Sequence, residues 1–308
     1  MGYIARKVAV SYENRRARGR NRKIMMNPSQ SVRKRRVSAP GLAAGALSAC
    51  LALCAGAQAG AETVKAGPWR PLFDGRTLEG WTPKVAKHPA GENYHQTFVV
   101  HHGVIRVSYA GYDKLDGQFG HLFYKTPFKA YRLRLNYRFL TEGGLPDTPA
   151  WARSNSGVMF HSQSPQSMTL DQSFPVSVEF QLLGDKRDAP KATGAVCTPG
   201  VNITFDGVQA KDHCTPPVNG PTIANGTWTK LELEVLPNGE VFQKINGAVV
   251  QHYAGLTYDP KDTVAPGAQA YLAAHGDAPI TEGYIALQSE GHPVEFKDIE
   301  IQELTAGR

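Results

Sequence analysis

The sequence predicts an all-β fold, a two-sheet jelly-roll sandwich that forms a single domain after a signal peptide. The chain has 308 residues, of which 31 are glycine and 21 proline. Beyond about residue 60, short runs of alternating apolar and polar residues are separated by turn sequences, and helical periodicity is almost absent. Many short, regularly spaced strands of this kind are typical of a sandwich or jelly roll.

Alternation with period two identifies the individual strands. It is clearest at Tyr131–Phe139, where apolar residues alternate with Arg and Asn. The Asn246-Gly247 pair between two such runs is a strong hairpin signal, because both residues tolerate positive φ. The further expected strands are 97–100 and 104–108, 155–161, 178–183, 228–236, 241–245 and 248–253, 283–288, and 293–301. Segments 142–153 and 184–226 are expected to be long loops that border a binding site.

The N-terminal region is expected to be a targeting segment and no part of the fold. Residues 1–40 carry twelve Lys and Arg against one acidic residue, and residues 37–59 are small and apolar, ending in Ala57-Gln58-Ala59. This pattern predicts a basic extension and secretory signal over 1–59, followed by a domain over 69–304 and no membrane span. Cleavage after Ala59 predicts a periplasmic or extracellular protein. The alternative is a lipid anchor on Cys50. The residues after Cys50 stay apolar, which argues against this alternative.

The positive charge of the chain belongs to its precursor segment. The whole chain has 34 basic and 27 acidic residues, a net charge of +7. Removing the twelve basic residues and one acidic residue of 1–40 leaves 22 against 26, a net charge of −4. The predicted domain therefore gives no reason to expect nucleic acid as a partner.

Two cysteines, Cys197 and Cys214, lie within the predicted domain. An exported chain enters a compartment where disulfides form. A redox pair or a pair of metal ligands is the alternative, but the chain has no C-x-x-C motif. We therefore expect a structural disulfide that closes a Pro- and Gly-rich loop beside the binding site.

Two neighbouring strands place polar side chains on one face. In 155–161, Asn155, Met159 and His161 share a side, and in 178–183 Glu179 and Gln181 share a side. Such a face predicts a polar groove for a sugar, which needs many hydrogen-bond partners. Two ordinary half-solvated antiparallel strands would show the same alternation.

Glu179 is the first candidate for a catalytic group, because a carboxyl shielded from water has a raised pKa suited to proton transfer. His161 is the second candidate, as its partner. The candidates for substrate binding are Asn155, Gln181, Trp151 and Gln288. A purely structural role is the alternative for each.

Several known catalytic arrangements are absent from the sequence. It contains no H-E-x-x-H, no G-x-S-x-G and no P-loop. A retaining glycosidase needs two carboxyls ~5–5.5 Å apart, yet Gln181 stands where the second would follow Glu179. No set of metal ligands is visible, so the cofactor is unknown and a divalent metal stays an open alternative.

The chain resembles the 3-keto-disaccharide hydrolase family from about Trp69 to Leu304. The motifs that carry the resemblance, in order, are Pro71-Leu-Phe-Asp-Gly-Arg-Thr-Leu-Glu-Gly-Trp81, Asn155-Ser-Gly157, Glu179-Phe-Gln-Leu-Leu183, Thr193-Gly-Ala195, Asn246-Gly247, Gly283-Tyr-Ile-Ala-Leu-Gln288 and Val294-Glu-Phe-Lys-Asp-Ile299. The resemblance implies a concanavalin A-like lectin or glucanase fold with a concave sheet, in an exported bacterial protein that acts on 3-keto-glycosides. Many family members carry Arg where this chain has His161, which leaves the substrate's identity open.

The chemistry that the resemblance implies needs one good base. A ketone at C3 acidifies the C2 proton, so its removal starts elimination of the C1 substituent, and water then adds to the double bond. Our hypothesis places Glu179 as base or acid, His161 as its partner, and Asn155 and Gln181 as orienting groups. The alternatives are a non-catalytic lectin-type carbohydrate-binding domain and an ordinary glycoside hydrolase.

Overall fold

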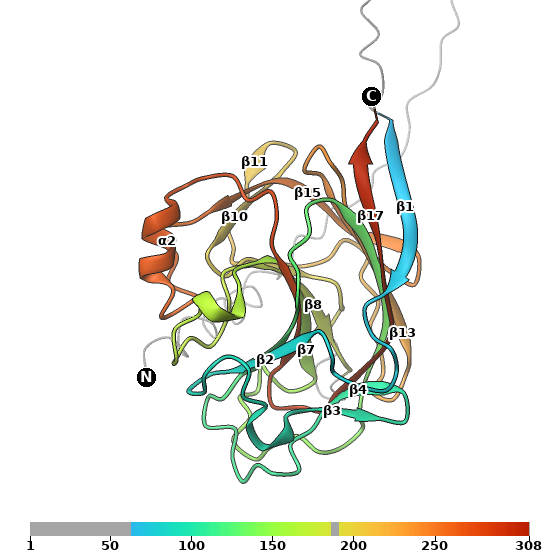
Figure 1. The fold of residues 1–308 in the computed structure, drawn as a ribbon, viewed down its shortest axis with the longest axis vertical. Coiled ribbons are helices and arrows are strands. Elements are labelled where there is room, and N and C mark those ends of the chain that lie inside the picture. The colour runs from blue at the N-terminus through green and yellow to red at the C-terminus, as the bar shows by residue number, and fades with distance from the viewer. Residues whose placement is uncertain (1–62, 186–190, 308) are drawn as a thin grey trace, which may run out of the picture. The chain divides into compact units, whose positions relative to one another are not determined.

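The computed structural model describes residues 63–185 and 191–307, and the predicted signal segment and Cys50 fall outside them. Within the described ranges, no helix has the length and apolarity needed to cross a lipid bilayer. The chain forms two antiparallel sheets (Figure 1). The predicted all-β two-sheet sandwich is therefore confirmed.

The larger sheet has the order β11-β10-β15-β14-β13-β6-β17-β4-β3, and β1 also pairs with β17. Its strands are β1 (Val64–Pro71), β3 (Phe98–His101), β4 (Val104–Val107), β6 (Tyr131–Phe139), β10 (Val201–Phe205), β11 (Val208–Gln209), β13 (Thr229–Val235), β14 (Val241–Ile245), β15 (Ala248–Tyr258) and β17 (Val294–Ala306). β1 and β17 run side by side, so the first and last described strands pair with each other (Figure 1).

The smaller sheet has the order β12-β9-β8-β7-β16-β5-β2. Its strands are β2 (Trp81–Val85), β5 (Gly120–Tyr124), β7 (Asn155–Ser162), β8 (Val178–Leu183), β9 (Val196–Cys197), β12 (Cys214–Thr215) and β16 (Tyr284–Ser289). The helical segments between residues 63 and 307 that the structure describes are two short 3-10 turns, η1 (Tyr94–Gln96) and η2 (Pro165–Ser167), and the helix α2 (Gln269–His275).

The predicted alternation is observed where one strand face packs on the core. β6 alternates buried and half-buried residues along its whole length. The β14–β15 hairpin turns at Asn246 and Gly247, whose φ angles are 50° and 84°, as the paired positive-φ residues of a tight hairpin require. Segment 184–226, expected to be a loop, instead contains the short strands β9, β10, β11 and β12, which extend both sheets.

One hydrophobic core joins the two sheets. Leu133 and Leu135 of β6 belong to the same buried cluster as Phe180 of β8 and Leu287 of β16. On the other face of the smaller sheet a separate small cluster forms, made of Phe123, Met159, Met168 and Ala286. The smaller sheet therefore has two covered faces, and the one turned away from the main core carries the polar residues described next.

Candidate active site

A row of polar side chains crosses the smaller sheet on the face turned away from the main core. Lys84 of β2 pairs with His121 of β5, and His121 pairs with Gln288 of β16. On the other side of β16, Gly157 of β7 pairs with Gln181 of β8. The register thus aligns residues from strands that are far apart in the sequence.

Glu179 lies on the same face, and its carboxyl group extends towards this row. It pairs with Met159 of β7. A Cβ atom built on Gly157 would lie only 2.5 Å from Glu179 Oε1 and 2.7 Å from its Cγ. The carboxyl group therefore occupies the space that a side chain at position 157 would fill, which places it between β8 and β16.

The site is shielded from water. Every residue of β7 is buried, which rules out the half-solvated strand considered above. Glu179 is 6% exposed, and His121 and Gln288 are fully buried. The expectation that Glu179 is shielded is confirmed.

Burial sets the charge states in the site. It raises the pKa of Glu179 to about 8, because a buried carboxylate loses its hydration. It lowers the pKa of His121 to about 3, and the nearby positive charge of Lys84 acts in the same direction. Near neutral pH the imidazole is therefore uncharged, while Glu179 can exchange a proton in the range where enzymes commonly operate.

Several buried polar atoms of this face lack a hydrogen-bond partner. Within the described ranges these include both ring nitrogens of His121, both amide atoms of Gln288, Glu179 Oε1 and Asn155 Oδ1. Buried polar atoms are nearly always paired in native proteins. A group of them on one sheet face therefore marks a place where a polar ligand would complete the hydrogen bonds.

Aromatic side chains stand beside the polar row. Phe174, from the segment that links β7 to β8, stacks on Phe119 at 5.2 Å between ring centroids and lies 6.2 Å from the His121 ring. Trp151 lies 5.6 Å from Phe119. Sugar rings offer apolar C–H faces as well as hydroxyls, so polar groups flanked by aromatic rings suit a carbohydrate.

The predicted binding residues hold different positions. Gln288 faces the site with Tyr284, opposite Ile285 and Leu287, as the alternation indicates. Gln181 is half-buried on the site face. Asn155 Nδ2 donates to the backbone oxygen of Trp151 at 3.2 Å, which ties the 142–153 loop to β7 and leaves Oδ1 for a ligand.

The prediction that His161 shares the face of Glu179 is wrong. The pairing of β7 with β16 shifts by one residue between Met159 and Ser162, and His161 has φ of 47°. This β-bulge turns His161 towards the main core, where its ring lies 6.3 Å from that of Tyr131. His161 therefore does not join Glu179, and burial lowers its pKa to about 4.

His121 is the site residue that sequence reasoning missed. Its strand alternates in the usual way, with Leu122 and Tyr124 in the main core and Phe123 in the second cluster. The same alternation puts His121 on the face of Phe123. That signal was present in the sequence, but nothing in it indicated that β5 would lie beside β16.

The predicted disulfide between Cys197 and Cys214 is confirmed. It joins β9 to β12, and Cys197 pairs with Glu179 on β8. Among the described residues, Cys197, His213 and Cys214 form the group of His, Cys, Asp or Glu side chains placed to share a metal ion. The disulfide occupies both sulfur atoms.

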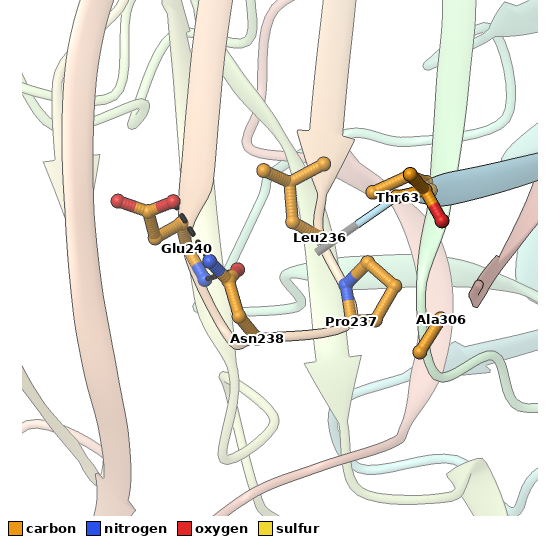
Figure 2. A pocket seen from close by; sticks show the side chains of 7 residues that line it. Thr63, Leu236, Pro237, Asn238, Glu240 and Ala306 are labelled. Carbon is orange, nitrogen blue, oxygen red and sulfur yellow. Dashed lines mark hydrogen bonds between the residues drawn. The ribbon is translucent and has the colours of Figure 1, made fainter. Parts of the chain in front are cut away.

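A surface hollow of about 220 Å³ lies elsewhere, between the start of β1 and the turn from β13 to β14 (Figure 2). Its polar side chains include Asn238 and Glu240, which hydrogen-bond to each other at 2.9 Å. It contains no residue of the polar row. The row on the smaller sheet is therefore the stronger candidate for the active site.

The model of the 3-keto-alpha-glucoside-1,2-lyase-like domain family matches residues 68–302. The chain belongs to this family. No curated protein sequence matches it significantly. Membership assigns the protein to a carbohydrate-active group, and the predicted family is confirmed.

Solved structures of similar architecture share little sequence with the chain. A Parabacteroides distasonis protein provisionally named a glycosyl hydrolase is 18% identical, with 77% of this chain and 94% of that chain covered and a TM-score of 0.46. A Bacillus subtilis protein of unknown function with a galectin-like fold is 11% identical, with 80% and 100% covered and a TM-score of 0.46. β-Agarase B from Zobellia galactanivorans is 11% identical, with 79% and 95% covered and a TM-score of 0.45.

Proposed function

We propose that the protein is an exported enzyme that cleaves 3-keto-glycosides by proton abstraction, elimination and hydration. Glu179 removes the proton from C2, and the electron pair of that bond forms an enolate with the C3 ketone. The enolate reforms the C3 ketone and makes a C1–C2 double bond as the C1–O bond breaks, and the leaving oxygen takes up the proton that Glu179 had removed. Water then adds its hydroxyl to C1 and its proton to C2, which gives a 3-keto sugar and the free aglycone.

A single buried carboxyl group carries this proposal. Glu179 is the one acidic residue in the described strands of the smaller sheet. Ordinary glycoside hydrolysis needs two carboxyls on either side of the scissile bond. Elimination next to a ketone needs one base whose pKa lies near the working pH, and burial raises the pKa of Glu179 to about 8.

The disulfide and the family support the remaining parts of the proposal. Cys197–Cys214 suits an oxidising compartment, in agreement with the predicted signal segment. The family's description names a 3-keto-α-glucoside lyase, and acting on such a substrate is the proposal for this chain.

The test compares 3-keto-glucosides with their unoxidised parents, with and without EDTA, and follows the products by mass spectrometry. Cleavage of the keto substrates alone is expected. Glu179→Gln should reduce this turnover by about 10²- to 10⁴-fold, the usual contribution of a general base. Glu232→Gln, on β13 of the other sheet, is the matched control and should leave turnover unchanged.

Two results would contradict the proposal. Turnover by Glu179→Gln at the wild-type rate would remove Glu179 from the chemistry. Binding of unoxidised sugars without cleavage of any keto substrate would instead indicate the lectin-type function. Loss of activity in EDTA would add a divalent cation to the mechanism.

A further inference from the structure

We infer that His121 and Gln288 together bind the C3 oxygen of the substrate and stabilise the enolate that forms when Glu179 removes the C2 proton. This inference rests on the proposed function. It adds an oxyanion site, made of two side chains, to the base.

The first observation is the placement of the two side chains. His121 and Gln288 are register partners on the adjacent strands β5 and β16. Both are fully buried. Side chains that face the same way on paired positions have Cβ atoms about 4.5–5.5 Å apart, so the two polar ends can approach one ligand atom.

The second observation is that neither side chain is used by the fold. Both nitrogens of the His121 ring and both amide atoms of Gln288 lack a partner within the described ranges. Lys84, which pairs with His121 from the other side, is already occupied, since its Nζ donates to the backbone oxygens of Val85 and Leu170. Buried polar groups are nearly always paired in native proteins, so two adjacent unpaired side chains form a place where a polar ligand would complete the hydrogen bonds.

The chemistry of the pair fits an oxygen that becomes negative. Because burial and Lys84 hold His121 neutral, its ring carries one N–H, which can donate to the ligand. The Gln288 amide supplies a second donor. Two fixed donors in a site shielded from water stabilise a developing oxyanion much more than water does.

The position of Glu179 completes the geometry. Ser156 Oγ donates to the backbone oxygen of Gln288 at 2.9 Å, which holds β7 against β16 beside the pair. The Glu179 carboxyl covers Gly157, the next residue of β7. Neighbouring strands lie about 4.8 Å apart. The carboxyl over β7 is thus about one strand from Gln288 on β16 and about two strands from His121 on β5, on the same face of the sheet.

The test isolates enolate formation from bond cleavage. The probe is 3-keto-1,5-anhydroglucitol, which keeps the C2 proton and the C3 ketone but has no leaving group at C1. In D₂O, exchange of its C2 proton reports the enolate alone, and cleavage of a 3-keto-glucoside is measured in parallel. His121→Phe should slow both reactions by about 10²- to 10³-fold through kcat, as loss of an oxyanion donor does, with KM changed less than fivefold.

Conservative variants separate this role from structural damage. His121→Gln keeps a donor near the same place and should recover at least tenfold over His121→Phe. Gln288→Leu removes the other donor and should slow exchange to a similar extent. This variant tests the same oxyanion site if His121→Phe does not fold. His252→Gln changes an exposed histidine of β15 and is the matched control.

Three results would overturn the inference. If His121→Phe exchanged the C2 proton within fivefold of the wild-type rate, His121 would be excluded from the enolate site. Cleavage of the keto substrate by the wild type would then still support the proposed function. An effect confined to KM would assign His121 to ground-state binding. A divalent cation that is needed for exchange and is no longer bound by His121→Phe would make His121 a metal ligand. Absence of both reactions in the wild type would instead reject the proposed function itself.

Discussion

The carboxyl group of Glu179 rests over the backbone of Gly157 on the neighbouring strand. A Cβ at position 157 would lie within 2.9 Å of three atoms of the Glu179 side chain. Gly157 has no positive φ, so its lack of a side chain is explained by this approach and not by backbone conformation. Asn155-Ser-Gly157 and Glu179 are thus physically linked parts of one site.

Gly157→Ala should reduce turnover by at least tenfold while the domain stays folded. The backbone tolerates alanine, but the new methyl group displaces the carboxyl, and a shift of about 1 Å in a catalytic group can cost 10²-fold. Steady-state kinetics with a 3-keto-glucoside, together with thermal unfolding, measure both effects. Gly67→Ala on β1 is the control, because its Cβ would meet its nearest neighbour at 3.4 Å. Unchanged kinetics in Gly157→Ala would contradict this role of the glycine.

The pH dependence of cleavage should report the ionisation of Glu179. If the carboxylate is the base, kcat/KM rises with pH and levels off above an apparent pKa of about 8. The measurement is a pH profile of kcat/KM, corrected for the spontaneous breakdown of the keto sugar in alkali. A profile that falls through the same range would assign the protonated acid, not the base, to the rate-limiting step.

Glu179 should also make the folded protein less stable as pH rises. Its pKa is raised from 4.5 to about 8 on folding, so between these values the folded state binds more protons than the unfolded state. The stability associated with its protonated form is present below pH 4.5 and is lost as the pH rises through 8. Glu179→Gln lacks this titration, so its Tm should exceed that of the wild type by more at pH 8 than at pH 5. Equal differences at both pH values would show that the carboxyl is not buried in solution.

Removal of the disulfide should destabilise the domain by about 3 kcal/mol, the chain-entropy value for a loop of this size. Cys197 and Cys214 are separated by 17 residues. For a domain of this length, each kcal/mol shifts Tm by about 2–4 °C, so the Cys197→Ala/Cys214→Ala variant should melt roughly 6–12 °C lower. Wild type treated with a reducing agent should show the same shift, and the double variant should not respond to that agent. If the Tm of the Cys197→Ala/Cys214→Ala variant equalled that of the wild type, the disulfide would have no role in stabilising the domain.

Much of the fold was predictable because its signals are local. The alternation in Tyr131–Phe139 and the Asn246-Gly247 turn depend only on neighbouring residues, and both predicted elements are present. The period-two alternation also correctly placed Glu179 and Gln181 on one face, because side chains two residues apart in a regular strand always point to the same side. The strands within 184–226 were missed because most are only two residues long and exist through pairing with longer strands.

The sequence by itself determined the sandwich class, the paired cysteines, the family and the strand face that carries Glu179. The tertiary structure decided which side chains share that face. It brought His121 to Gln288 through the register of β5 and β16, and it turned His161 away through a bulge whose existence depends on how β7 pairs with β16. The physical reason is that alternation fixes direction within one strand, whereas register and bulges arise from contacts between strands far apart in the chain.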